Sequence, residues 1–171
     1  MMSVKNTEGR ENILMNSLNE KRSVPSQFER QLCNVQGKMF ELSAKKNLSS
    51  LEFIDSYMKS KTASFFDLPF DRTQWLGEEN LLQDILEEIP NLPHGKTFDL
   101  DSLFWMGYLY RYWHFFTGQT SCEIIKNCNV RLLHSLYPAY HTLDCGQAID
   151  RILESATEKC RKSDFQLTFC L

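Results

Sequence analysis

Apolar residues recur every three or four positions along most of this chain, the spacing that places them on one face of an α-helix. In residues 26–46 these positions are Phe28, Leu32, Val35, Met39 and Leu42. The same spacing is found in residues 50–58, 74–89 and 144–156. We therefore predict an all-α fold built from amphipathic helices.

Most of these segments begin with a helix-start signal, in which Ser, Thr or Asp is followed three residues later by Glu or Gln. The five pairs are Ser26 with Glu29, Ser49 with Glu52, Asp71 with Gln74, Thr120 with Glu123, and Asp144 with Gln147. In such a pair, side-chain oxygens accept hydrogen bonds from backbone amides that have no partner within the helix. The sequence shows no Gly-rich phosphate loop and no internal repeat.

Eight of the thirteen positions from Phe104 to Phe116 carry aromatic side chains. They fall on every side of a helix, which is typical of a helix surrounded by other elements. Because aromatic side chains bury the largest areas, this helix is expected at the centre of the molecule. It begins near Asp99 and ends at Gly118, in the left-handed role that glycine often takes after a helix. The predicted fold is a single compact domain of about six to seven helices around it.

Residues 62–70 lack helical spacing, and their aromatic side chains flank Pro69. We interpret this stretch as a loop that is held onto the core by Phe65, Phe66 and Phe70.

The next helix is expected to run from Asp71 to Pro90 and to bury Trp75 together with Leu82 and Ile85. Its outer face carries five acidic residues, Glu78, Glu79, Asp84, Glu87 and Glu88. Two such carboxylates can hold a metal when histidines face them, but no Glu/His pair at a spacing of three is present. We interpret this acidic face as solvated, and as a candidate for contact with a basic partner surface.

Three regions of the chain differ in pattern. Residues 1–24 are polar with weak periodicity and are expected to form a flexible N-terminal segment. Residues 25–160 carry the helical pattern and are expected to form the domain. In residues 161–171 apolar positions alternate as in a strand, but no partner strand is evident, so we expect an irregular tail.

Composition narrows the range of functions. The chain has 171 residues and a formal net charge of −3, with 19 Lys and Arg scattered among 22 Asp and Glu. No basic run marks a nucleic-acid interface, so nucleic acid is not expected as a direct ligand. No stretch approaches the roughly 20 apolar residues of a membrane helix, and a cytoplasmic protein without membrane contact is expected.

The six cysteines contain no CxxC pair and are expected to be reduced, mostly buried thiols. Cys122 and Cys128 could bind zinc together with His114 or His141, but the gap between the thiols is wrong for the usual zinc site. We therefore expect no metal and no other cofactor.

A polar stripe interrupts the central aromatic helix. Gly107, Tyr110, Arg111, His114 and Gly118 lie three or four positions apart and share one side. The stripe is either a contact surface where Arg111 meets an acidic or phosphate group, or a packing surface. In the second interpretation, which we favour, Gly107 admits a crossing helix while Arg111 and His114 pair with core carboxylates.

A second group of candidate residues follows Pro138. His141 could act as a base beside Cys145, although neighbours in sequence seldom reach attack geometry. Thr142 and Asp144 are more readily explained as caps of the last helix. An enzyme would need Arg111, His114 and His141 in one pocket. Separately, the two short helices around residues 127–130 resemble a helix-turn-helix, but the second offers only Arg131 and His134 for reading bases.

Residues 71–88 and 103–153 together resemble an uncharacterised family of small helical bacterial proteins. In that family a GYxYRYWH helix, here residues 107–114, precedes an HTxD…AI ending, here starting at His141. The last part also resembles short antitoxin-like domains that are encoded beside ADP-ribosyltransferase-like toxins. The positions that match the family pattern are Tyr108, Tyr110, Arg111, Tyr112, Trp113, His114, His141, Thr142 and Asp144.

The resemblance implies a small, non-enzymatic protein that binds another protein and neutralises it, as an antitoxin does. The partner would then be a toxin. An alternative is a mobile-element inhibitor of a bacterial defence nuclease, of the anti-CRISPR kind. Two further hypotheses are a DNA-binding regulator and a small enzyme that uses Arg111, His114 and His141. The oligomeric state is left open.

Overall fold

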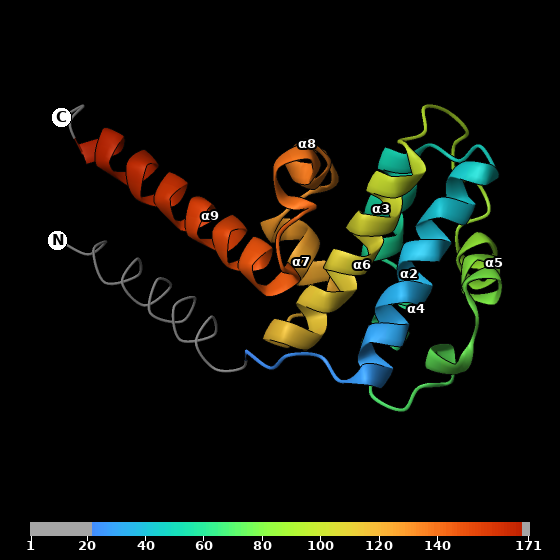
Figure 1. Ribbon diagram of the computed structural model, residues 1–171. Helices are drawn as coiled ribbons and strands as arrows, with labels where there is room; N and C mark the ends of the chain where they lie inside the picture. The colour runs from blue at the N-terminus through green and yellow to red at the C-terminus, as the bar shows by residue number, and fades with distance from the viewer. Residues whose placement is uncertain (1–21, 169–171) are drawn as a thin grey trace, which may run out of the picture.

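The computed structural model describes the backbone of residues 22–168 and the side chains of residues 22–157. This part of the chain forms eight α-helices, one short 3-10 helix and no strand, so the predicted all-α fold is confirmed (Figure 1). The elements are α2 (Gln27–Lys45), α3 (Ser50–Met58), α4 (Lys61–Asp67), η1 (Arg72–Trp75), α5 (Glu78–Glu88), α6 (Leu100–Thr117), α7 (Ser121–Asn127), α8 (Val130–Tyr140) and α9 (Cys145–Thr168).

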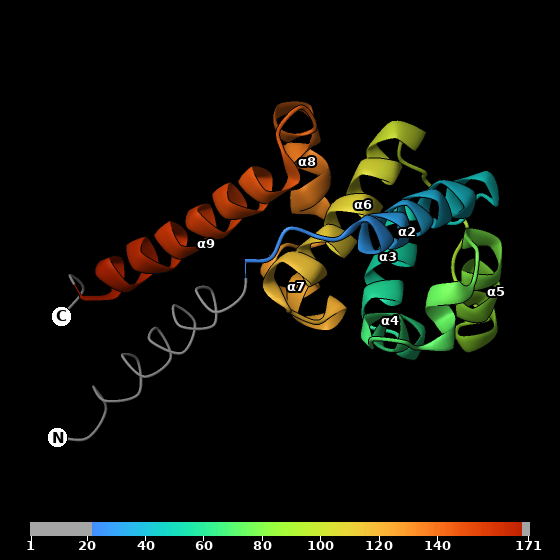
Figure 2. The same ribbon diagram turned by 60° about the horizontal axis from the view of Figure 1, so that its bottom comes forward.

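The aromatic helix α6 lies at the centre, as predicted. Helices α2, α7, α8 and α9 all pack against it, and its contact with α2 is the most extensive between any two described helices. Figure 2 shows α2 crossing α6 on one side of the body, while the outer part of α9 extends away from it. The side chains of Leu103, Met106, Leu109 and Trp113 are fully buried. A helix that is apolar around most of its circumference is stabilised by this many-sided burial.

Two glycines allow α2 and α6 to approach each other closely. A Cβ added at Gly107 would lie 2.7 Å from the carbonyl oxygen of Gln36 and 2.8 Å from Cα of Gly37. A Cβ added at Gly37 would lie 2.9 Å from the carbonyl oxygen of Phe104. These atoms belong to the backbone and cannot move aside as a flexible side chain can. The helices therefore cross where neither has a side chain, and the predicted role of Gly107 is confirmed.

Several of the predicted helix boundaries are confirmed by their hydrogen bonds. Capping boxes are formed by Ser26 with Glu29 and by Thr120 with Glu123. Gly118 ends α6 with a left-handed φ of 76°. At Ser49 the predicted cap does not form, because its hydroxyl donates to the Glu52 carboxylate instead of accepting from the backbone.

The loop expected over residues 62–70 is partly wrong. Residues 61–67 form α4, and only Phe66 among its two aromatic residues is buried. Phe65 is 50 % exposed and Phe70 is 90 % exposed, so these rings are not held onto the core. Successive helical residues point about 100° apart, and a helix that turns Phe66 inward therefore directs Phe65 outward.

The single helix expected from Asp71 to Pro90 is also corrected. The Asp71 side chain accepts from the amide of Thr73 and begins only the 3-10 helix η1. Gly77 then has an extended backbone and precedes α5, which begins a new helix at Glu78. Because Trp75 lies before this break, it is not on the inner face of α5 and is 73 % exposed.

At the C-terminal end, the irregular tail expected from residue 161 is wrong for residues 161–168. These residues are helical, because α9 continues to Thr168. The N-terminal segment predicted to be flexible lies mostly outside the described residues, which begin at Arg22.

We predict that Gly107→Ala lowers the free energy of unfolding by about 3 kcal/mol, because overpacking of this kind forces backbone shifts. Chemical denaturation followed by circular dichroism measures the change.

The matched control is Gly77→Ala, where an added Cβ meets no atom within 4 Å. Its expected cost is below about 1 kcal/mol, which reflects only the change of helix cap. Equal losses in the two variants would contradict the close crossing of α2 and α6.

Candidate functional site

The side chain of Arg111 on α6 is 0 % exposed and has partners on three other helices. Its Nη1 donates to Asp67 Oδ1 at 2.6 Å, and its Nε donates to Gln36 Oε1 at 2.9 Å. Its Nη2 donates to Ser121 Oγ at 3.3 Å. The guanidinium carbon lies 4.4 Å from the centre of the Phe66 ring. The buried charge of Arg111 therefore has the counter-ion and the hydrogen bonds that a buried charge requires. The contact with the Phe66 ring adds a cation–π attraction.

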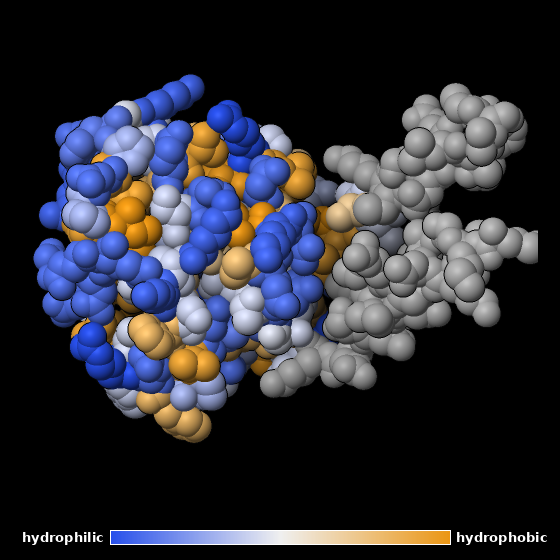
Figure 3. Space-filling view, turned by 180° about the vertical axis from the view of Figure 1, so that it is seen from behind, coloured by the Kyte–Doolittle hydropathy of each residue, from blue (hydrophilic) through white to orange (hydrophobic). Residues whose placement is uncertain are grey.

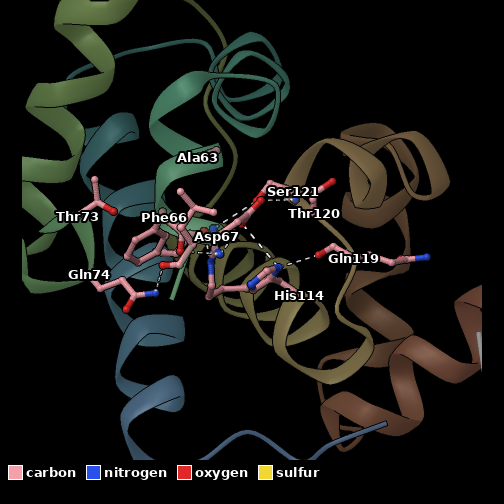
Figure 4. Close-up of polar contacts among 12 residues, drawn as sticks. Ala63, Phe66, Asp67, Thr73, Gln74, His114, Gln119, Thr120 and Ser121 are labelled. Atoms are coloured by element: carbon pink, nitrogen blue, oxygen red, sulfur yellow. Dashed lines mark hydrogen bonds and ion pairs between the residues drawn. The ribbon is translucent and has the colours of Figure 1, made fainter. Parts of the chain in front are cut away.

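Asp67 ends α4 and connects it to α6 and α7 (Figure 4). Its Oδ2 accepts from the amide of Ser121 at 2.7 Å, and its Oδ1 accepts from the Ser121 hydroxyl at 2.8 Å. One carboxylate thus balances Arg111 and also satisfies an amide at the start of α7, where negative charge is favourable.

Gln36 extends this network to α2 and α3. Its Nε2 donates to the carbonyl oxygen of Gly107 at 3.0 Å, beside the glycine crossing. The Tyr57 hydroxyl donates to Gln36 Oε1 at 3.0 Å. Burial raises the pKa of Tyr57 to about 12, so this hydroxyl keeps its proton. Together these bonds join α2, α3, α4, α6 and α7 through one buried polar network.

His114 lies one turn after Arg111 and closes the network towards the surface. Its Nδ1 lies 2.7 Å from the carbonyl oxygen of Gln119 and 3.7 Å from Asp67 Oδ1. The short contact to a carbonyl requires a proton on Nδ1. Burial and then the positive charge of Arg111 lower the pKa of His114, and the nearby Asp67 carboxylate only partly opposes them. The imidazole is therefore neutral at pH 7.

Asp67, His114 and Ser121 lie together, but their hydrogen bonds are not those of a catalytic triad. The Ser121 hydroxyl donates to the carboxylate rather than to His114, and Ser121 is 2 % exposed. In a triad the histidine bridges the nucleophile and the carboxylate. Among the described side chains, every buried nitrogen or oxygen has a hydrogen-bond partner. We conclude that this network holds the helices together. The predicted pairing of Arg111 with a core carboxylate is confirmed.

The remaining family-pattern residues lie outside this network, and Tyr108, Tyr112 and Asp144 line a separate hollow of about 390 Å³. Tyr110 is buried, and its hydroxyl donates to the carbonyl oxygen of Cys128 at 2.8 Å, while Tyr108 is half-buried. Asp144 accepts from the amide of Gly146 at 2.9 Å and so caps α9.

His141 lies apart from the Arg111 network. It is exposed at the end of α8, with Nδ1 2.9 Å from the carbonyl oxygen of Tyr137 and its ring against that of Tyr137. The structure thus brings Arg111 and His114 together on Asp67. No described hydrogen bond, ion pair or ring contact joins His141 to them.

The acidic residues of α5 have different roles. Glu88 accepts from the amides of Lys61 and Thr62 and so caps α4 rather than facing solvent alone. These hydrogen bonds lower its pKa although desolvation opposes them. Glu78 lies 3.8 Å from Lys38 on α2, and Glu79 and Glu87 are exposed.

The described cysteines fit their prediction as free thiols. Cys33 and Cys128 are buried, and burial raises the pKa of each to about 12, so both remain protonated. Among the described residues, no group of three His, Cys, Asp or Glu side chains is placed to hold a metal ion.

The surface feature that the sequence analysis missed is an aromatic patch formed by Phe28, Phe70 and Trp75. The rings of Phe28 and Trp75 touch, with centroids 5.6 Å apart. The three residues line a cleft of about 540 Å³ together with Leu32, Pro69, Phe115 and other residues, and His114 and Asp67 also border it. The segment between α4 and α5 that carries most of the patch lies at the lower edge of the molecule in Figure 1. Figure 3, which shows the opposite side, has hydrophobic side chains projecting at its lower edge.

One signal in the sequence could have indicated this patch. Ala63 and Phe66, three positions apart, already account for the inward face of a short helix, and both are buried. Phe70, which follows Pro69, had no core-facing position left in that pattern. A surplus of this kind indicates exposed apolar side chains.

This chain matches no family model, no curated protein and no solved structure. In the described part of the chain, no helix combines the length and the apolar character that crossing a membrane requires.

We predict that Asp67→Asn lowers the free energy of unfolding by about 3–5 kcal/mol, because it leaves the Arg111 charge buried without a counter-ion. The matched control is Asp55→Asn, which breaks an exposed ion pair with Lys59 and is expected to cost less than about 0.5 kcal/mol. Chemical denaturation measures both. A cost for Asp67→Asn as small as that of the control would rule out the network as a stabilising element.

We predict that His114 makes the protein less stable as the pH falls from 7.5 to 5.5. The unfolded chain takes up a proton near pH 6.5, whereas the lowered pKa of the folded imidazole delays uptake, so protons favour unfolding in this window. In His114→Gln, whose amide can still donate to Gln119, this part of the pH dependence is lost. Unfolding free energies at four pH values, with His141→Gln as control, test this. An unchanged slope in His114→Gln would disprove the assignment.

Proposed function

We propose that this chain is a non-enzymatic protein-binding inhibitor of the antitoxin type, which neutralises a partner protein by direct contact through the aromatic patch. The observation that carries this proposal is the exposure of Phe70 and Trp75, at 90 % and 73 %, beside an apolar cleft. Large aromatic side chains in contact with water are costly to maintain and are enriched at protein interfaces.

The backbone at Phe70 adds independent support. Its φ is 63°, a left-handed conformation that non-glycine residues seldom adopt and that glycine adopts without strain. Such a conformation costs on the order of 1–3 kcal/mol and persists where function requires it. The ring gains no burial in return, because it is almost fully exposed. A role in contact with a partner accounts for both the strain and the exposure.

The interior offers no competing role for the polar residues of α6. Arg111 and His114 are occupied by Asp67, Gln36 and Gln119, and they stabilise the fold beneath the cleft. The likeness of the C-terminal region to antitoxin-like domains supports an inhibitory contact. A toxin or a defence nuclease is a partner of the class that such small proteins bind.

We predict that Phe70→Gly abolishes partner capture without harming the fold. The tagged protein is cross-linked in cells of its source organism, and retained proteins are identified by mass spectrometry. A true partner is retained by the wild type, is lost with Phe70→Gly, and loses its own activity when purified wild-type protein is added in equimolar amount. Because glycine relieves the left-handed strain, the unfolding free energy is expected to stay within about 1 kcal/mol of the wild type or to rise.

The matched control is Leu100→Ser, which removes another exposed apolar side chain, 41 % exposed, at the start of α6 outside the patch. This variant is expected to retain the partner. Equal capture by Phe70→Gly and the wild type, or the absence of any captured protein whose activity is inhibited, would refute the proposal.

A further inference from the structure

The segment from Pro69 to Trp75, which we call the ridge, borders two hollows of different character. Phe70 and Trp75 line the apolar cleft on one side. Asp71, Arg72 and Thr73, which lie between them in sequence, line a second hollow of about 340 Å³. Its other lining residues are Thr62, Phe65, Asp84 and Glu87. Neighbouring ridge residues thus line different hollows, so the two hollows adjoin along the ridge and one partner segment that crosses it would meet both.

The apolar cleft requires an apolar anchor. Aromatic and aliphatic side chains form much of its lining, and each of its polar side chains already has a hydrogen-bond partner within the protein. These polar side chains are Ser26, Glu29, Asp67, Gln74 and His114. Asp67 accepts from Arg111 and Ser121, and His114 is bonded to Gln119. A polar anchor would therefore find few groups to bond with and would lose its hydration. An aliphatic or aromatic side chain would bury the exposed surfaces of the patch without that cost.

The second hollow carries uncompensated negative charge. It contains the carboxylates of Asp71, Asp84 and Glu87 and the single guanidinium of Arg72. Arg72 lies 3.7 Å from Asp84 and its side chain is 79 % exposed, so this pair is loose. Hydrogen bonds from Thr73 lower the pKa of Asp71 and keep that carboxylate ionised. Three carboxylates facing one cation favour the approach of a further positive charge.

Building on the proposed function, we infer that the partner protein binds through a surface segment that places an apolar side chain in the cleft and a Lys or Arg in the acidic hollow across the ridge. The apolar anchor supplies most of the affinity, because it desolvates the aromatic patch. The basic residue supplies orientation and selects among partners. A nucleic acid or an anionic membrane lacks the positive charge that the hollow attracts.

The test is selection of a display library of random 12-residue peptides on the immobilised full-length protein. We expect enriched peptides in which an aliphatic or aromatic residue lies close to Lys or Arg, at about ten times the frequency in the starting library. The variant Asp71→Asn/Asp84→Asn/Glu87→Gln keeps the shape of the hollow and removes its negative charge. On this variant the enrichment of Lys and Arg is expected to disappear while that of apolar residues remains.

A matched control neutralises three carboxylates outside the hollow, in Glu41→Gln/Asp101→Asn/Glu154→Gln, and is expected to behave as the wild type. Peptides enriched in acidic residues, apolar peptides without Lys or Arg, or no enrichment would each overturn the inference. A dimer of this chain that Phe70→Gly dissociates would overturn it as well, because the patch would then bind a second copy.

The outcome can be separated from that of the proposed function. If a partner captured from cells depends on Phe70 but binds the charge-neutralised variant as well as the wild type, the proposed function holds and the inference about its chemistry fails. If capture does not depend on Phe70, the proposed function itself fails.

Discussion

The ion pair between Arg111 and Asp67 determines where α4, α6 and α7 meet. A guanidinium without access to water must have both a counter-charge and hydrogen-bond acceptors, and Asp67, Gln36 and Phe66 meet these needs from α4 and α2. Because Asp67 is also bonded to Ser121 and Gln36 to Gly107, a shift of one helix would leave several buried polar groups unsatisfied. The network therefore favours one arrangement of the helices over the many that apolar burial alone would permit.

The glycine crossing and the polar network depend on each other. Gln36 lies beside Gly37, and its amide bonds to the carbonyl oxygen of Gly107 where α2 and α6 are closest. Only at this short separation can Gln36 also reach Arg111, which lies one turn further along α6. Close packing and polar bonding thus reinforce each other at the same point of the fold.

The polar residues of the interior are bonded to one another, so the proposed contact with a partner protein is made by the surface. The ridge between α4 and α5 is short, strained at Phe70 and rich in aromatic side chains, whereas α6 beneath it is closely packed. A rigid support under an exposed aromatic patch reduces the entropy that binding would otherwise cost. Under the proposed function, the Arg111 network is the support and the patch is the binding surface.

The sequence by itself determined most of the helices and several of their ends, because those signals are local; α4 and the break between η1 and α5 were not among them. The capping boxes at Ser26 and Thr120, the left-handed Gly118 and the three-and-four spacing of apolar residues involve atoms within a few positions of each other. The central place of α6 also followed from its composition, since a helix with aromatic residues on all sides has to be surrounded. For Arg111 the sequence indicated a buried carboxylate partner but not which one.

Only the tertiary structure decided that the partner is Asp67, that Gly107 meets Gly37, and that Phe70 and Trp75 face water. Arg111 and Asp67 are 44 residues apart, and Gly107 and Gly37 are 70 apart, so no local pattern relates them. Whether an aromatic side chain is buried depends on how much core surface the other helices leave for it. That remaining surface is set by the packing of the whole domain. In this protein α4 and α5 reach the core through Phe66, Leu82 and Ile85, whereas Phe70 and Trp75 on the segment between them stay outside it.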